Sequence, residues 1–198
     1  MDGGGHSLTA ENGWLPSVTP VPWPTDSLWT QAQTALRRSL AANGTRMAPA
    51  RRQAAAIAHD RGCLAALFEE VAAITCAVCA TPCCLHAKVW FDFKDLLFLH
   101  LNRKPLPPHQ LRRNLRGSCR YLESRGCHLP HQARPWICSW YICPDLQGAI
   151  TRDVPGGWVL VDGLRERVKA RRDAMEKAYL EALGFSAAQA ALSDRVIG

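Results

Sequence analysis

Residues 76–84 of the chain read CAVCATPCC, which places Cys76, Cys79, Cys83 and Cys84 within one short stretch. The spacing of Cys76 and Cys79 lets two thiolates turn toward one metal ion, because the two residues between them form a tight loop. Adjacent cysteines seldom point the same way. We therefore expect Cys83 and Cys84 either to ligate two separate metals or to divide ligation and packing between them. This stretch predicts metal-binding loops at the centre of the fold.

A second group of cysteines follows at wider spacings. Its members are Cys119, Cys127, Cys138 and Cys143. Loops this far apart can share a metal only if the fold brings them together. Four plus four cysteines suggest two tetrahedral sites or one larger cluster. All eight thiols are predicted metal ligands.

The pattern leaves iron–sulfur and zinc both open as the bound group. Cys143-Pro144 resembles the cysteine–proline pair that closes ferredoxin ligand runs. Bulky apolar residues around Cys138, including Trp136 and Trp140, would shield a cluster from water and oxidants. All-cysteine zinc sites are nevertheless common, and aromatic residues belong to any small core. An iron–sulfur cluster, with 4Fe–4S as one form, is placed slightly ahead of zinc.

The same cysteines resemble a known family, the YkgJ-type cysteine-cluster proteins, which are described as a zinc- or iron-chelating domain. The matching motifs are Cys76-x-x-Cys79 with Cys83-Cys84, Tyr121-Leu122, Gly126-Cys127, and Arg134-Pro135-x-x-Cys138. The resemblance spans residues 76–144 and implies metal chelation. Three residues rather than two separate Cys79 from Cys83, so the chain departs there from the family's C-x-x-C-x-x-C-C core. A branch of the family is similar to flagellin lysine methylases, which keeps methyl transfer open as an alternative.

Other residues near these motifs are expected to have supporting roles. Cys63 stands alone in an alanine-rich helical stretch and is predicted to be a buried structural thiol. His86, His128 and His131 could replace a cysteine at a metal. Because eight thiols are already available, surface or supporting roles suit these histidines better. Arg134 is expected to bond backbone carbonyls of the cysteine loop, or cluster sulfurs.

Composition indicates a cytoplasmic protein. Of the 198 residues, 47% are hydrophobic and 21% are charged, and no apolar run approaches the roughly 20 residues that a membrane span needs. Residues 1–13 lack the basic start and apolar run of a signal peptide. Nine thiols in a reducing compartment fit metal ligands or redox centres better than a disulfide framework.

The net charge of +7 would suit a polyanion partner, but bound metal changes the sum. One Zn²⁺ or oxidised four-iron site with four thiolates gives roughly +5, and two such sites give roughly +3. The basic residues within 165–172 share one helix with Glu166 and Asp173, so we expect a solvated face. Nucleic acid is therefore not expected as a partner, whereas a redox or metal-delivery protein is. The oligomeric state stays open.

Helical periodicity predicts a mainly α protein, a small irregular helical domain with the cysteine loops at its centre. Helices are predicted over 27–42, about 50–75, 93–101 with Asp92 as N-cap, 109–115, about 163–183, and from Ser186 onward, with brief strands at 88–91 and 158–161.

The chain is predicted to hold one folded domain after an N-terminal arm. Residues 1–26 are expected to be flexible, with Trp14 and Trp23 as docking points. Residues 27–198 form the cysteine-cluster domain, in which 76–144 is the metal-binding core and 163–198 contributes the C-terminal helices.

These features together predict a metal-chelating protein in a redox, metal-handling or sensing role. One alternative is a cluster-dependent enzyme, either an oxidoreductase or a protein lysine methylase-like modifier. Another is a structural zinc module that binds nucleic acid. The sequence lacks a Gly-rich phosphate loop, a nucleophile–base pair and paired carboxylates at informative spacing, which favours binding over catalysis. Whether the protein is an enzyme stays open.

Overall fold

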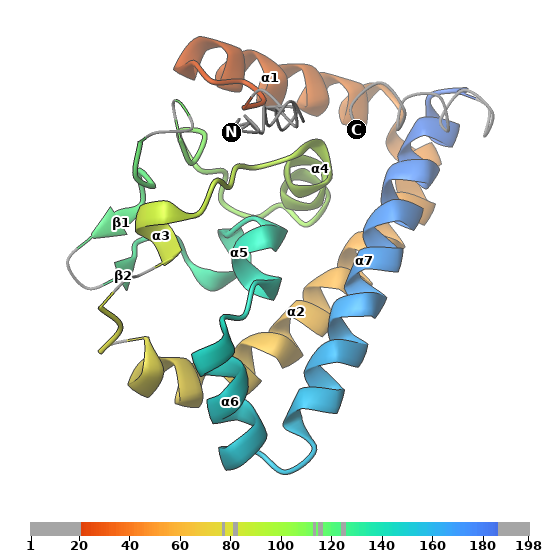
Figure 1. The fold of residues 1–198 in the computed structure, drawn as a ribbon. Helices are drawn as coiled ribbons and strands as arrows, with labels where there is room; N and C mark the ends of the chain where they lie inside the picture. Colours follow the sequence, from red (N-terminus) through yellow and green to blue (C-terminus); the bar gives the residue numbers. More distant parts are fainter. Residues whose placement is uncertain are drawn as a thin grey trace, which may run out of the picture.

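The computed structural model describes residues 21–76, 78–80, 83–112, 114, 117–123 and 126–185, and this part of the chain is mainly helical (Figure 1). Helix α2 (Ala48–Thr75) and helix α7 (Gly157–Ala182) run antiparallel and make the most extensive contact between two elements. The mainly α fold class predicted from periodicity is confirmed for the described residues. None of the described helices combines the length and the apolar character needed to cross a membrane.

Both long helices bury most of the apolar stripe that their periodicity predicted, although Ile74, the last residue of the predicted stripe on α2, is 76% exposed. The buried members are Ile57, Leu64, Phe68 and Val71 on α2, and Leu164, Val168, Met175 and Tyr179 on α7. Burying a side chain of this size stabilises the fold by about 1.5–3 kcal/mol, so this pair of helices supplies much of the core. The position of Cys76 as the C-cap of α2 places the first cysteine at the end of a rigid element.

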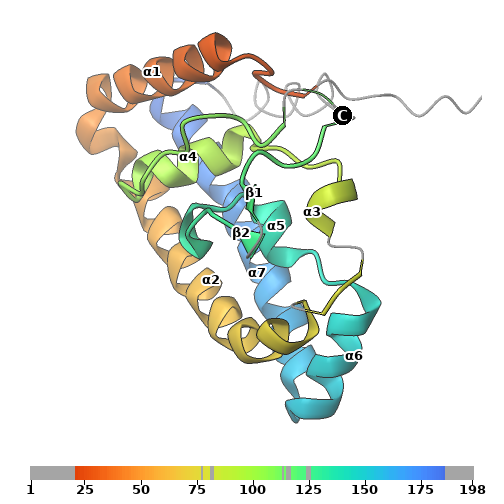
Figure 2. The same cartoon turned by 90° about the vertical axis from the view of Figure 1, so that its left-hand side faces the viewer.

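A second layer covers the end of this pair at which α2 begins (Figures 1 and 2). It consists of α1 (Asp26–Ala42), the 3-10 helix η1 (Gly44–Met47) and α4 (Phe93–Leu101). Trp29 of α1 is fully buried, and its indole N–H donates to the carbonyl of Pro107 at 2.9 Å. Trp23 packs against Trp29 with ring centroids 5.9 Å apart, which anchors the chain just before α1.

The predicted N-cap of α4 is confirmed. The Asp92 carboxylate accepts the Asp95 amide at 2.7 Å, and the Asp95 carboxylate accepts the Asp92 amide at 3.2 Å. This reciprocal capping box satisfies two amides that a helix start otherwise leaves unpaired. Asp95 is thereby fixed in the interior, where it meets other elements.

Short elements that contain or adjoin several of the remaining cysteines lie beside α2 and α7 (Figure 2). They are α3 (Cys83–His86), β1 (Leu122–Glu123), β2 (Gly126–Cys127), the 3-10 helix η2 (His131–Ala133), α5 (Trp136–Trp140) and α6 (Pro144–Asp153). The two strands are antiparallel, with Leu122 opposite Cys127. The helices α5 and α6 were not expected from the sequence, and α5 has only five residues, which is too few to display a helical repeat.

Buried ion pairs join the helices, which corrects the expectation of a fully solvated basic face on α7. Arg172 is only 5% exposed, and it donates to Asp95 at 2.6 Å and to both oxygens of Asp92 at 2.7 and 2.8 Å. Arg171 donates to the buried Asp60 at 2.5 Å. These arginines are therefore structural cations rather than a surface charge run.

Three predicted elements are wrong. Residues 88–91 form no strand, because the Phe91 amide is taken by the Gln110 side chain at 2.7 Å instead of a ladder partner. Residues 109–112 are not helical. Residues 158–161 belong to the first turn of α7, which follows a turn with Gly156 at φ 71°. Trp14 and the helix predicted from Ser186 lie outside the described residues.

Candidate metal centre

One set of thiols lies where helices end or begin. Cys76 caps α2, the Cys79 amide donates to the Cys76 carbonyl at 3.3 Å, and Cys143 caps α6. The pKa of Cys76 is raised by burial and then by the charges of Cys143, Cys83 and Cys79. These four thiols are close enough to influence one another, and we call them the helix-end set.

A second set of thiols surrounds the short hairpin. Cys84 of α3 lies against Cys119, whose amide donates to the Cys84 carbonyl at 3.3 Å, and Cys127 ends the second strand. The surrounding protein, followed by the charges of Cys119 and Cys127, raises the pKa of Cys138 to about 12, although that residue keeps an exposed surface. We call Cys84, Cys119, Cys127 and Cys138 the hairpin set.

Cys83 and Cys84 connect the two sets. A hydrogen bond with Cys84 lowers the pKa of Cys83 to about 6, and the same bond raises the pKa of Cys84. The Cys83 charge also raises the pKa of Cys138, so this thiol lies between the two sets. At neutral pH, Cys83 is therefore mostly a thiolate, and it accepts a hydrogen bond from the Cys84 thiol.

The sets cut across the two groups that the sequence suggested. By sequence, Cys143 belongs with Cys138. Its charge, however, comes first among the thiol charges that add to the effect of burial and raise the pKa of Cys76. Cys84 belongs by sequence with Cys76, yet the charges of Cys119 and Cys127 act on it. The fold thus interleaves the two cysteine-rich stretches rather than keeping one site for each.

Two buried arginines fasten the segments that carry these thiols. Arg112 is 2% exposed and donates to the Cys84 carbonyl at 2.9 Å and to the Gly117 carbonyl. Arg61 of α2 is also 2% exposed and donates to the Arg134 carbonyl at 2.7 Å and to the Ser139 hydroxyl at 2.9 Å. Arg112 thus joins the backbone at Cys84 to the backbone at Gly117, and Arg61 holds the chain on both sides of Cys138.

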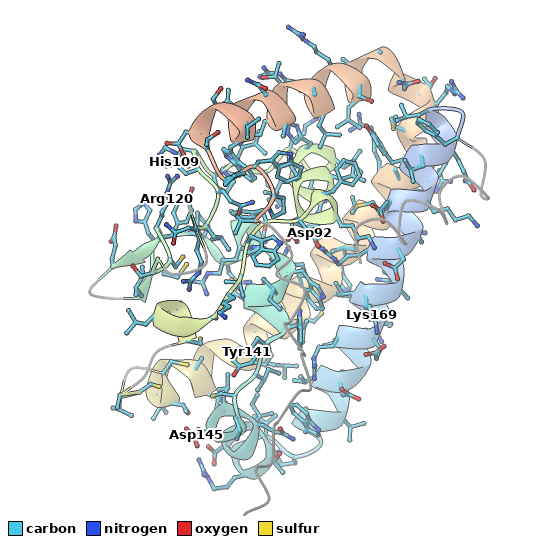
Figure 3. The ribbon with its side chains drawn as sticks, turned by 45° about the horizontal axis from the view of Figure 1, so that its top comes forward. Asp92, His109, Arg120, Tyr141, Asp145 and Lys169 are labelled. Atoms are coloured by element: carbon cyan, nitrogen blue, oxygen red, sulfur yellow. The ribbon has the colours of Figure 1, made fainter. Side chains whose placement is uncertain are left out.

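Two further contacts tie this region to the helical layers. Asp26 at the start of α1 accepts from Arg120 at 2.7 Å and lies 3.1 Å from the His109 ring nitrogen (Figure 3). Arg120 holds the pKa of Asp26 below its usual value. The Trp136 amide, at the start of α5, donates to Asp95 at 2.8 Å. Cys119 thus directly precedes, and Cys138 closely follows, a residue that is anchored to another part of the fold.

The residues that were expected to support the cysteine motifs differ in their surroundings. Arg134 donates to the Leu129 carbonyl at 3.1 Å, as expected for a residue that bonds the backbone of the cysteine loop. His128 is exposed beside Glu123. Burial, followed by Arg134 and Arg61, lowers the pKa of His131 to about 4. The His86 side chain is outside the described part of the structure.

Cys63 is not the buried thiol that the sequence predicted. It is exposed on α2, where its sulfur lies 4.0 Å from Nε2 of His59. The alanine-rich surroundings suggested burial, but position 63 follows Gly62 on the outward side of the helix. Cys63 and Cys76 are separated by about 20 Å along α2, which makes Cys63 a useful control thiol.

Proximity does not amount to a closed coordination sphere. Among the described residues, no three or more His, Cys, Asp or Glu side chains are arranged so that they could hold a metal ion. The predicted ligands are therefore neighbours that influence one another, without converging on one point. Burial was not predicted for Arg61, Arg112 and Asp95, because an isolated charged residue has no local sequence pattern that indicates burial.

The low pKa of Cys83 predicts selective alkylation of the metal-free protein. At pH 7 a thiol with a pKa of about 6 is mostly thiolate, so iodoacetamide should label Cys83 well before Cys138. Its rate should rise with pH and level off above that pKa. Replacing Cys84 with alanine returns the Cys83 pKa toward 9 and slows labelling at pH 7 by about four-fold, after intrinsic nucleophilicity is allowed for.

Peptide mass spectrometry of chelator-treated protein measures these rates site by site. The matched control is Cys84→Ser, because its hydroxyl keeps a donor beside Cys83 and should leave the rate nearly unchanged. Equal labelling of Cys83 in the alanine variant and the unmodified protein would show that Cys84 does not set its pKa.

Comparison with known proteins finds no matching family model, no matching curated protein and no matching solved structure. The resemblance to the YkgJ-type family therefore rests on the cysteine motifs and stays a prediction.

Proposed function

We propose that this chain is a metal-chelating cysteine-cluster protein of the YkgJ type, in which eight thiols hold an iron–sulfur cluster or zinc. The observation that carries the proposal is the electrostatic linkage of those eight thiols, which come from separate segments of the chain. Thiols that lie this close repel one another once they are ionised, and a bound cation would offset that repulsion. The ninth cysteine, Cys63, has no place in this linkage.

The donor chemistry fits such a group. Thiolates are the ligands that zinc and iron–sulfur clusters prefer, and a set of four is the common number for either. Burial raises the pKa of Cys76 and Cys138, the hydrogen bond with Cys83 raises the pKa of Cys84, and neighbouring thiol charges add to all three shifts. A bound cation would favour the ionised form of each thiol. When bound, zinc would supply a structural or transferable cation, and an iron–sulfur cluster would supply an electron carrier.

We assign one metal centre to the helix-end set and one to the hairpin set. This assignment puts Cys83 and Cys84 on different centres, which agrees with the expectation that adjacent thiols point in different directions. Each set then offers four thiolates drawn from both cysteine-rich stretches. Because Cys83 and Cys84 are adjacent in the chain, the two proposed centres would be neighbours.

A redox or metal-delivery protein is the proposed partner. Ile74 and Val78 flank Cys76 and are 76% and 82% exposed, and Tyr141 near Cys143 is 50% exposed. Exposed apolar side chains of this kind are typical of surfaces that contact another protein. Their position next to the helix-end set supports exchange at that set.

The test is an ultraviolet–visible spectrum of anaerobically purified protein, with iron, sulfide and zinc measured on the same sample. Broad absorption near the violet–blue boundary with matching iron and sulfide is expected for a cluster. Stoichiometric zinc in a colourless sample would support chelation and assign the centres to zinc. Cys63→Ser should leave either content unchanged. Protein that contains neither metal after purification and after reconstitution would contradict the proposal.

A further inference from the structure

The corner at which α1 passes through η1 into α2 concentrates positive charge. The arginines there are Arg37, Arg38, Arg46, Arg51 and Arg52. No aspartate or glutamate occurs between Asp26 and Asp60, so nothing in this stretch offsets the five charges. We call these five residues the arginine corner.

The arginine corner has no internal partners in the described part of the chain. Four of its side chains are exposed, Arg51 is half-buried, and none donates a hydrogen bond or forms an ion pair there. The arginines of α7 differ, because Arg171 and Arg172 are paired with buried carboxylates. Among the described residues, unpaired arginines therefore gather at the corner, whereas Arg171 and Arg172 of α7 are held by carboxylates.

The end of α4 adds to this surface. The Asn102 amide donates to the Ala54 carbonyl of α2 at 3.1 Å, which holds the end of α4 beside the corner. Burial of His100 on α4 lowers the pKa of that histidine, and the nearby charge of Arg37 lowers it further. Arg103 follows on the same connection and is exposed. Positive charge thus extends from α1 across α4 to α2.

We infer that the arginine corner binds the phosphate backbone of nucleic acid. All five cations are arginine, whose planar fork matches phosphate with two parallel hydrogen bonds. No large hydrophobic side chain is exposed between Leu28 and Ile74 in the described residues. Protein–protein interfaces have an apolar centre, whereas nucleic-acid interfaces are polar and strongly positive. The surface therefore fits a phosphate backbone better than an acidic protein.

The position of the corner separates this activity from the proposed metal centres. Arg52 lies near the start of α2 and Cys76 caps its end, so about 36 Å of helix lies between them. A partner that exchanges metal or electrons at the helix-end set cannot contact both places over that distance unless it is large. The two surfaces can therefore be tested independently.

The experiment measures binding of the full chain to a labelled duplex DNA of about 20 base pairs by fluorescence anisotropy, between about 50 and 200 mM salt. Four or five phosphate contacts predict a slope of log K against log salt of about −4. The double variant Arg38→Gln/Arg52→Gln should weaken binding about ten-fold or more at the lowest salt and reduce the slope by about 2.

The matched control removes two charges elsewhere, as Arg152→Gln/Lys169→Gln. Arg152 is exposed on α6. Lys169 is exposed on α7 (Figure 3). The control should bind like the unmodified chain, and circular dichroism should show that both variants are folded. Equal weakening in both variants would assign binding to net charge and overturn the inference. Polyglutamate that competes as well as DNA at equal charge would overturn it in favour of an acidic protein. Both double variants should have the same metal content as the unmodified chain.

Discussion

Replacing Asp95 with alanine is expected to lower the free energy of unfolding by about 3–5 kcal/mol. Asp95 is 3% exposed and accepts from Arg172 at 2.6 Å and from the Trp136 amide at 2.8 Å. The variant leaves the buried guanidinium with Asp92 alone and the buried amide without an acceptor, and it breaks the capping box of α4. A loss of this size corresponds to a fall in Tm of roughly 6–20 °C for a domain of this length.

Urea unfolding followed by circular dichroism at about pH 8 measures the effect, because burial raises the Asp95 pKa to about 6 and the carboxylate is then ionised. The control is Asp173→Ala. Asp173 also pairs with a cation, Lys94, at 2.7 Å, but its side chain is 61% exposed. That variant should change the free energy of unfolding by at most about 0.5 kcal/mol. Equal losses of unfolding free energy in the two variants would show that burial does not strengthen the contribution of the Asp95–Arg172 pair to stability.

Two double cysteine variants are expected to lose different amounts of metal. Cys76→Ser/Cys143→Ser removes two ligands from the helix-end set alone, so about half of the metal should remain in the hairpin set. Cys76→Ser/Cys84→Ser removes one ligand from each set, so nearly all of the metal should be lost. Grouping by sequence predicts the opposite order, because Cys76 and Cys84 lie in one stretch while Cys143 lies in the other.

Metal analysis after reconstitution, normalised to protein, distinguishes the two groupings. Circular dichroism on the same samples checks that the variants remain folded, and Cys63→Ser controls for the loss of a thiol outside both sets. Greater retention of metal in Cys76→Ser/Cys84→Ser than in Cys76→Ser/Cys143→Ser would disprove the assignment by structure. Complete loss in both would indicate one shared cluster instead of two centres.

The sequence predicted the long helices because their signal is local. Ile57, Leu64, Val168 and Met175 recur at helical spacing, and each is buried where that spacing places it. The local sequence led to a wrong prediction of a strand at residues 158–161, because a Trp-Val-Leu-Val run favours a strand when taken alone. Tertiary context decides such a short run, and here it continues into the helix that Gly157 begins.

The candidate site was predictable in its composition and not in its arrangement. The clustering of cysteines is visible in the sequence, but which thiols are neighbours depends on contacts between distant segments. Arg61 meets its acceptors in residues 134 and 139, and Arg172 meets Asp95 across α4 and α7. A lone arginine in a helix has the same local pattern whether it is solvated or buried. Such residues can be recognised only when their partners are known.

The bonds from Arg61 and Arg112 to backbone carbonyls have a consequence for how metal and folding are related. In a zinc finger the metal supplies the folding free energy, so removing it unfolds the chain. Here the protein itself fixes the thiol-bearing segments, through donors that are present whether or not a metal is bound. For the proposed metal centres, we therefore expect loading and unloading to change occupancy without unfolding the chain, as a carrier or a sensor requires.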